Sequence, residues 1–428
     1  MRNKKLFYFA IGFLLFAIIF AFAFQFLKNK NGGGSTTGLI NSVFENIFPF
    51  KTIVDEKGNN LTEDLKVGQL EEGPEIETRP TLLKITPLPV SGATLFDATR
   101  EKIVYQETAS GSVPVTEKFI GRFIRYAEKS SGHIYEVPFD GFVKSKITGT
   151  TIPGTEEVLF DNTANYAIFR YYDDTVGRIK SFSGQIPTSS TEIGRVSGEY
   201  LDDDILSISF SPKDAKIIFS KEEGVYTNIF TSDFNGKNKK QTFSSPFSEW
   251  LLDWPNENNF TITTKPSSYF AGFVYQIDAK TNAIEKISGN VSGVTYKEGS
   301  DQNKGLLGSA GKDSLVLYLL NKETGGATNL SIGTLPEKCT FSSNSLVYCF
   351  VPNFLPSAVY PDDWYKGKVL FSDSLWAINL DSRAANKIVD ISELAGEAID
   401  GINLSLSDDN EDLIFINKKD LSLWLYDL

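Results

Sequence analysis

From residue 82 onward, short runs of Ile, Val, Phe and Tyr alternate with turns rich in Gly, Asp, Ser and Asn, and helical periodicity is nearly absent. Apolar runs bounded by turn residues are typical of β-strands. One unit recurs: an apolar residue, a polar turn and then a hydrophobic strand. Its seven copies are LFDATREKIVY (95–105), LFDNTANYAIFRYY (159–172), SFSPKDAKIIFS (209–220), DWPNENNFTITT (253–264), LGSAGKDSLVLYL (307–319), TFSSNSLVYCFV (340–351) and SLSDDNEDLIFIN (405–417).

This repeat predicts the fold. A period near 40–50 residues with several strands in each unit is typical of β-propellers. We therefore predict an all-β fold, a seven-bladed β-propeller, with six or eight blades as alternatives. In the first copy, the polar turn is expected directly after Phe96.

The two ends of the repeat region complement each other. The last copy stops at LSLWLYDL (421–428), after its third strand, and a fourth strand is missing. The segment LLKITPLPVSGATLF (82–96) is similar to IEKISGNVSGVTY (284–296), in which a fourth strand leads into the next blade. We therefore predict that Leu82 to Thr86 supplies the outer strand of the last blade. Sharing one sheet between both ends removes an open edge and closes the ring.

The N-terminal segment differs from the rest of the chain. Residues 6–27 carry no charge, and an apolar helix of about 20 residues spans the hydrocarbon core of a bilayer. Arg2, Lys4 and Lys5 precede the run, which places the N-terminus in the cytoplasm by the positive-inside rule. We predict a single-pass anchor in the cell membrane that displays an extracytoplasmic propeller. The alternative is a cleaved signal peptide with Ala-Phe-Ala at 21–23 as its cleavage site.

Three regions follow from these patterns: a cytoplasmic tip with a transmembrane helix (1–30), a linker (31–81) and the propeller (82–428). The linker begins with a Gly-rich, flexible stretch. Apolar residues at helical spacing then form a short amphipathic segment that ends at Pro49. Between Asp55 and Arg79, eight acidic and three basic residues indicate a solvated, disordered stalk.

Composition excludes several classes of function. The net charge of −12 argues against nucleic-acid binding, which needs a basic surface. With one His and two Cys, the chain has neither a multi-His metal centre nor a Cys₄ zinc site. Glycine-rich phosphate loops and the common hydrolase motifs are also missing. We assign no catalytic residue, no cofactor and no metal ligand.

Two groups of motifs resemble known propeller families. The turns SPKDAK and SDDNED resemble the SPDGK turns of WD40-like (TolB-type) repeats. In addition, GATLF, FIRYAEKSSGHIYEV, SSPFSEWLLDWP, TTKPS, TLPEKC and YPDDWYKGKVLFSD resemble, in that order, a family of uncharacterised membrane-anchored propeller proteins from candidate-phylum bacteria. The resemblance implies the fold and the anchor. It implies no activity.

Cys339 and Cys349 flank the segment CTFSSNSLVYC. A hairpin turn centred on Asn344 makes the two cysteines direct cross-strand partners, whose Cα atoms lie within disulfide reach. An extracytoplasmic location permits this bond. We therefore predict a disulfide. The alternative is a pair of buried free thiols.

Other candidates have plainer interpretations. His133 falls at a hairpin turn, where we expect a surface residue. The acidic runs 202–204 and 408–412 contain oxygen ligands that suit Ca²⁺, but they lack EF-hand spacing. Asp and Asn beside strands commonly cap the backbone of turns, and this is the favoured interpretation.

The sixth repeat carries a long insertion, residues 350–371. Aromatic residues beside carboxylates on a long loop are typical of protein or glycan contacts. The alternative is a loop folded over the ring, with its aromatic rings packed down. The candidate partner contacts are Tyr360, Asp362, Asp363, Trp364 and Tyr365.

Three functions fit this organisation. We favour a binding or scaffolding module in the cell envelope with a protein or glycan partner, because propellers present a rigid surface and a fold by itself specifies no chemistry. The alternative is a glycosidase-like hydrolase with two carboxylates in the propeller channel, roughly 5–9.5 Å apart. A third option is an accessory subunit with a structural role, which would expose a large apolar patch.

Overall fold

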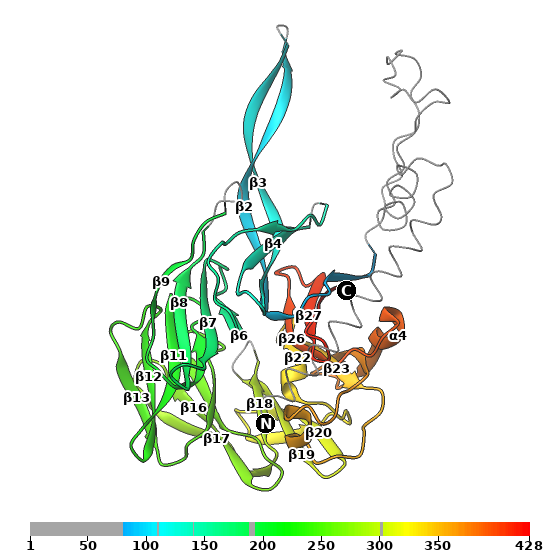
Figure 1. Ribbon diagram of the computed structural model, residues 1–428. Coiled ribbons are helices and arrows are strands. Elements are labelled where there is room, and N and C mark those ends of the chain that lie inside the picture. Colours follow the sequence, from blue (N-terminus) through cyan, green and yellow to red (C-terminus); the bar gives the residue numbers. More distant parts are fainter. Residues whose placement is uncertain (1–79, 109–110, 140, 188–192, 300–302) are drawn as a thin grey trace, which may run out of the picture. The chain divides into compact units, whose positions relative to one another are not determined.

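The computed structural model describes residues 80–108, 111–139, 141–187, 193–299 and 303–428. Its strands form seven sheets of four antiparallel strands each (Figure 1). This confirms the predicted seven-bladed, all-β propeller over the six- and eight-bladed alternatives. The predicted anchor at 6–27 lies outside the described residues. Among the residues that are described, no helix is long and apolar enough to cross a membrane.

The blades are numbered one to seven in chain order, and within blades one to six the strands follow one another in sequence. Blade one contains β2 (Val90–Thr108), β3 (Gly111–Glu128), β4 (Ile134–Pro138) and β5 (Ser145–Lys146), and blade two contains β6 (Thr155–Phe160), β7 (Tyr166–Asp173), β8 (Arg178–Gln185) and β9 (Ser197–Tyr200). Blade three contains β10 (Ile205–Phe210), β11 (Lys216–Glu223), β12 (Tyr226–Asp233) and β13 (Lys240–Ser245). Blade four contains β14 (Trp250–Asp253), β15 (Asn259–Thr264), β16 (Ala271–Asp278) and β17 (Ile284–Ser292).

The remaining blades carry the few helical turns in the described residues. Blade five contains β18 (Thr295–Glu298), β19 (Lys304–Gly311), β20 (Ser314–Asn321) and β21 (Gly326–Asn329). Blade six contains β22 (Cys339–Phe341), β23 (Leu346–Pro352), β24 (Asp373–Asn379) and β25 (Ala385–Val389). Blade seven contains β26 (Gly401–Leu406), β27 (Asp412–Asn417), β28 (Leu423–Asp427) and β1 (Leu82–Thr86). The helical turns are η1 (Pro336–Lys338), α3 (Asp362–Tyr365) and α4 (Ile391–Ala395).

The hydrophobic core lies in layers between successive blades. Adjacent residues on a strand point to opposite faces of its sheet, so a central strand covered on both faces has a continuous apolar run. Strand β11 shows this arrangement. Ile217 packs in a cluster with blade two, whereas Ile218 packs in a cluster with blade four. This explains why the repeat contains runs such as Ile-Ile-Phe rather than strict alternation of apolar and polar residues.

The ring closes as predicted. Strand β1 pairs antiparallel with β28, and Lys84 lies opposite Trp424. The Lys84 ammonium group lies 4.8 Å from the centroid of the Trp424 ring and 2.7 Å from Oε1 of Glu397. Leu83 and Ile85 pack against the core cluster between blades seven and one. Blade seven is therefore built from both ends of the propeller sequence.

The first repeat differs from its prediction. The polar residues after Phe96 do not form a turn, because β2 continues without interruption to Thr108 and pairs with β3 along its whole length. The charged residues in this stretch have oppositely charged partners across the hairpin: Lys102 lies 3.6 Å from Glu117. A run of polar residues is thus compatible with an exposed two-stranded ribbon, and the prediction of a turn here was wrong.

Candidate functional site

The two cysteines face each other across β22 and β23. Cys339 is the cross-strand partner of Cys349, their Cα atoms are 4.0 Å apart and their sulfur atoms are bonded. Both are fully buried in the core cluster shared by blades five and six. A disulfide in this position stabilises the blade and takes no part in a surface site.

The insertion of blade six lies against four blades. Asp362 accepts hydrogen bonds from Ser267 Oγ (2.9 Å) and the Ser268 amide (2.8 Å) in blade four. Asp313, in blade five, accepts one from the Ala358 amide at 2.9 Å. In blade seven, Asp400 accepts one from Trp364 Nε1 at 2.8 Å. The insertion is therefore a strap that joins its own blade to three others.

This packing corrects part of the predicted contact surface. Tyr360 and Trp364 are buried in the cluster beneath the strap, so neither side chain offers a surface to a partner. Asp363 accepts hydrogen bonds from the Val359 amide and Lys368 Nζ within the strap. Tyr365 keeps 39% of its surface exposed. Its contact role, like that of Asp362 and Asp363, stays a prediction.

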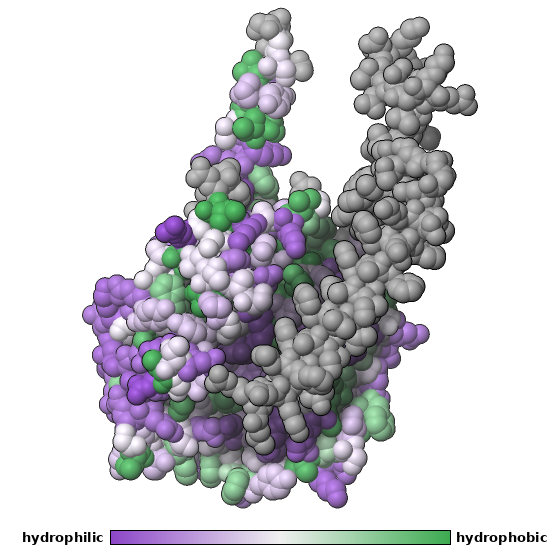
Figure 2. All heavy atoms as spheres, viewed as in Figure 1, coloured by the Kyte–Doolittle hydropathy of each residue, from purple (hydrophilic) through white to green (hydrophobic). Residues whose placement is uncertain are grey.

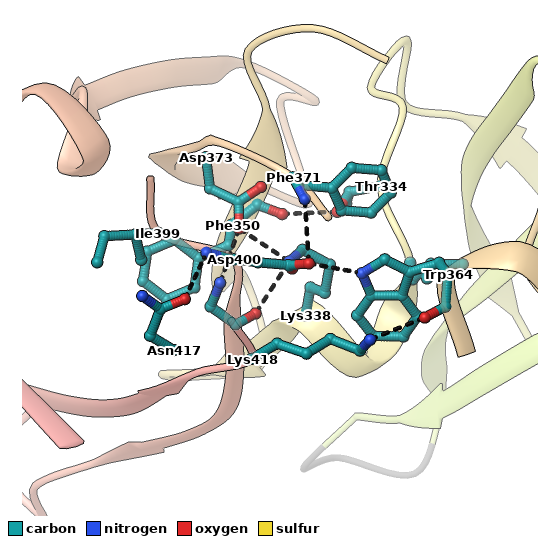
Figure 3. Close-up of polar contacts among 12 residues, drawn as sticks. Thr334, Lys338, Phe350, Trp364, Phe371, Asp373, Ile399, Asp400, Asn417 and Lys418 are labelled. Atoms are coloured by element: carbon teal, nitrogen blue, oxygen red, sulfur yellow. Dashed lines mark hydrogen bonds and ion pairs between the residues drawn. The ribbon is translucent and has the colours of Figure 1, made fainter. Parts of the chain in front are cut away.

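A buried ion cluster lies beneath the strap (Figure 3). Lys338, on η1, has its Nζ 2.8 Å from Oδ2 of Asp373 and also forms an ion pair with Asp400, and none of the three side chains is exposed. Lys338 Nζ also donates to the Gly401 carbonyl at 3.0 Å. The Asp400 carboxylate accepts from Trp364 as well, which links blades six and seven to the strap (Figure 3).

The electrostatics of this cluster indicate a structural role. Burial raises the pKa of Asp373 to about 6, although Lys338 acts in the opposite direction. Burial by itself lowers the pKa of Lys338, but the two carboxylates outweigh it and hold that pKa above its usual value. A substrate cannot reach side chains with no exposed surface. The carboxylate pair formed by Asp373 and Asp400 therefore cannot serve a hydrolase in this conformation.

A second group of charges lies on the inner elements of three successive blades. Asp253 ends β14, Lys297 lies on β18 and Glu337 lies on η1. Asp253 is exposed to solvent, and Lys297 and Glu337 are partly exposed. Desolvation by the surrounding protein atoms nevertheless raises the pKa of Asp253 and that of Glu337 and lowers that of Lys297, while the lysine interacts electrostatically with both acids. Tyr365 of the strap donates a hydrogen bond to Glu337 Oε1 at 2.6 Å. Such shifted acids are typical of functional sites, although structural ion pairs produce them too.

The remaining sequence candidates have structural roles. His133 lies at the turn between β3 and β4, and its Nε2 is 2.9 Å from Thr151 Oγ1. In the acidic run 202–204, Asp203 forms an ion pair with Lys180 at 2.7 Å. In the described part of the chain, no group of His, Cys, Asp and Glu side chains could hold a metal ion.

The hairpin of β2 and β3 is the feature that sequence reasoning missed. Beyond Asp97 and Arg122, the two strands leave blade one as a projecting ribbon, here called the arm (Figure 1). A usable signal was present in the sequence, because residues 103–105 and 113–115 are short apolar runs on either side of Thr-Ala-Ser-Gly-Ser at 108–112. That pattern is typical of a β-hairpin.

The arm exposes large apolar side chains. Ile103, Tyr105 and Ile120 are 67%, 71% and 78% exposed. Figure 2 shows hydrophobic residues in green along the projecting ribbon. An isolated two-stranded hairpin is marginally stable in water, and an exposed strand edge can pair with another chain. The arm therefore has the chemistry of a surface that binds another polypeptide.

Two ion networks fix the base of the arm. The Arg122 guanidinium contacts Asp97 at 3.1 Å and, in blade seven, Asp409 at 2.7 Å and Asp412 at 2.6 Å. On the opposite strand, Arg100 contacts Glu136 at 3.1 Å. The ion pair with Arg122 lowers the pKa of Asp409. Arg122 is largely buried and surrounded by carboxylates, so it anchors the root of the arm on two blades.

Comparison with known proteins gives no family. No protein-family model and no curated protein sequence matches the chain. Similar solved structures include an oligogalacturonate lyase in complex with manganese, at 9% identity and a TM-score of 0.46 over 78% of this chain and 98% of that one. TolB from Acinetobacter baumannii has 12% identity and a TM-score of 0.39, over 68% of this chain and 78% of that one.

A third similar structure is the β-propeller domain of the Trilobed protease from Pyrococcus furiosus. It has 11% identity and a TM-score of 0.46, over 72% of this chain and 91% of that one. The chain is thus identified by its own architecture, as a seven-bladed β-propeller with a projecting hairpin.

Proposed function

We propose that this protein is a binding module that recognises another polypeptide through its arm, with the propeller as the rigid base. One observation carries the proposal: a ribbon anchored at its root by Arg122 exposes Ile103, Tyr105 and Ile120 to solvent. Large apolar groups in fixed positions lose little conformational freedom on binding. Aromatic and apolar anchors of this kind dominate the energetics of protein interfaces.

The proposal includes a location. The uncharged run at 6–27 is long enough for a membrane anchor, and the acidic stalk that follows would hold the propeller away from the bilayer. We propose that the arm acts outside the membrane, in the cell envelope. Asp362, Asp363 and Tyr365 of the strap form a second candidate contact surface, for a protein or a glycan.

Site-specific photocrosslinking in native cells tests the arm. A photoreactive amino acid replaces Ile103 in the full chain. In the control it replaces Val225, which is 82% exposed at the turn between β11 and β12. We expect a discrete crosslinked product from position 103 and none from position 225. Equal crosslinking at both positions, or none at either, would overturn the proposal.

A shortened arm provides the matched loss-of-function variant. Ala98 and Gly121 are cross-strand partners, so an Asn-Gly turn can join them in place of residues 99–120. Asp97 and Arg122 remain, which keeps the ion pairs at the root. We expect this variant to fold with the thermal stability of the wild type and to lose binding of the partner. Retained binding would place the interface elsewhere.

One observation favours a second candidate function. Asp253 and Glu337 combine raised pKa values with a lysine, Lys297, that interacts electrostatically with both, and a carboxyl group with a raised pKa can act as a general acid. A glycosidase-like hydrolase would therefore use this pair. Release of reducing ends from envelope glycans, abolished by D253N and by E337Q, would support it. Release that is unchanged in both variants would exclude this pair.

A further inference from the structure

The two strands of the arm differ in their capacity to accept another strand. In the described residues β2 has β3 as its one sheet neighbour, so the edge of β2 that faces away from β3 pairs with no other strand. Strand β3 pairs with β4 along Phe123–Ala127 and carries Pro114 in its projecting part. Proline lacks an N–H group and interrupts the donors of an edge. Strand β2 has no proline from Val90 to Thr108, so its edge is the better template for strand addition.

Charge is balanced on the arm. Residues 99–120 contain three basic and three acidic side chains, whereas the whole chain carries a net charge of −12. Two of the acids are paired across the hairpin: Glu101 lies 3.8 Å from Lys118 and Glu117 lies 3.6 Å from Lys102. A strongly acidic or basic partner would gain no steering from a neutral arm. A partner surface that also has no net charge and alternates acidic and basic side chains would match the arm.

The sequence of β2 can pair with a second copy of itself in an antiparallel register centred on Ile103 that brings no like charges together. Pairing two copies about a twofold axis at Ile103 places Glu101 opposite Tyr105, Lys102 opposite Val104 and Arg100 opposite Gln106. No like charges then oppose each other. Moving the axis to Lys102 places two lysines together, and moving it to Glu101 places two glutamates together. Like charges directly opposite destabilise a sheet.

The geometry of the arm favours the same register. Ile103 lies near the midpoint between Asp97, where β2 leaves the blade, and Thr108, where β2 ends. An axis at Ile103 therefore overlaps the arms over their full length, with each tip reaching the root of the other arm. The large exposed side chain of Ile103 would meet its own counterpart at the centre.

We propose that the occupant of the arm is a second copy of this chain. The two β2 strands pair antiparallel about Ile103, which gives a four-stranded sheet in the order β3-β2-β2-β3. This inference rests on the proposed function, because it takes the arm as the binding surface. Four strands overcome the marginal stability of a two-stranded ribbon and cover the edge of β2.

Cysteine crosslinking of the full chain tests the register. The sequence contains two cysteines, and these form the disulfide between Cys339 and Cys349, so an introduced cysteine is the one reactive thiol. Direct cross-strand partners have Cα atoms about 4.5–5.5 Å apart, within disulfide reach. We expect I103C to form a disulfide-linked dimer under mild oxidation and V225C to remain monomeric. An I103C yield equal to that of V225C would overturn the proposal.

A mixture gives a sharper result. In the proposed register, Glu101 lies opposite Tyr105 of the second copy. We therefore expect E101C and Y105C to crosslink when the two variants are mixed, and neither to crosslink by itself. Crosslinking of E101C alone would contradict the axis at Ile103.

Matched charge substitutions test self-association without a covalent bond. I103D places two carboxylates together at the axis and should weaken dimerisation of the full chain by about tenfold or more, measured by sedimentation in detergent. V225D adds the same charge at the exposed turn between β11 and β12, outside the arm, and should leave the dimer intact. Equal effects of the two substitutions would contradict the proposal.

The photocrosslinking experiment separates the two levels of inference. A product from position 103 with the mass of two copies of the chain supports both the arm and the second copy. A product with a different polypeptide retains the arm as a binding surface and overturns the second copy. The absence of any product overturns both.

Discussion

Replacing Lys338 by Met tests whether the buried ion cluster holds the strap and the last two blades together. The Lys338 side chain is fully buried between Asp373 and Asp400. Methionine is flexible and fills irregular space in a core, so K338M keeps most of the packing and removes the charge. The two carboxylates then remain in the interior without the ammonium group that both of them contact.

The structure allows the magnitude to be worked out. Removing one partner of a buried ion pair costs about 3–5 kcal/mol, because the other charge stays desolvated. Here the uncompensated charge belongs to two carboxylates that share one ammonium group. We expect K338M to lower the free energy of unfolding by at least about 3 kcal/mol, a large part of the roughly 5–15 kcal/mol of a typical protein.

The assay is equilibrium unfolding in urea at pH 7.5, followed by tryptophan fluorescence. The control is K213M, because Lys213 and Glu257 form an ion pair of 2.6 Å on the surface, with side chains 67% and 54% exposed. Exposed pairs contribute at most about 1 kcal/mol. The double variant K338M/D373N should regain part of the lost stability, since one of the two charges is gone.

Acidity provides an internal check on the same variant. At pH 5 the uncompensated carboxylates of K338M can take up a proton, so the difference from the wild type should shrink. The reasoning is refuted if K338M costs no more than K213M at pH 7.5. It is also refuted if the deficit of K338M grows as the pH falls.

Three further predictions follow from single features of the fold. The pKa of Asp373 is raised to about 6, so the folded protein holds a proton on this carboxyl group that the unfolded chain has lost above pH 4. The free energy of unfolding should therefore fall by on the order of 2–3 kcal/mol as the pH rises from 4 to 7. D373N should remove this decrease when unfolding in urea is measured across the same pH range. L83D/I85D should separate β1 from β28 and accelerate amide hydrogen exchange in the last strand. C339A/C349A should cost about 2–3 kcal/mol in chemical unfolding, as expected for a short disulfide loop.

Each of these has a control and an outcome against it. A D373N profile as steep as that of the wild type would assign the slope to other groups. For ring closure the control is Y200D on β9, an exposed outer strand that joins no chain ends. If L83D/I85D exchanges no faster than Y200D, β1 does not hold the ring closed. For the cysteines, unchanged stability of the wild type after reduction would contradict a stabilising disulfide.

The repeated local pattern was sufficient to predict the number of blades. Each unit carries its own turn signal, such as Ser-Pro-Lys-Asp between β10 and β11, and its own apolar strands. Ring closure was also predictable, because the last unit lacks a strand that Leu82–Thr86 supplies. These predictions depend on backbone propensities and on neighbours in the chain, which a sequence records directly.

Two features were decided by the tertiary structure. The polar run after Phe96 reads as a turn in the sequence, and it became the arm because its residues find oppositely charged partners across a long hairpin. Lys338 carries no local signal. It meets Asp400 because the ring brings blades six and seven together.

The amino-acid sequence by itself thus determined which segments are strands and how many blades they form, because strand and turn preferences act over a few residues. Which charges are buried together, and which hairpin projects into solvent, depended on contacts between segments far apart in the chain. Burial makes a charge costly, and an oppositely charged partner offsets that cost. Both effects arise only once the neighbouring blades are in place. A strap over the ring was one of the interpretations of residues 350–371 from the sequence, whereas the ion cluster under Trp364 could be recognised only in the folded protein.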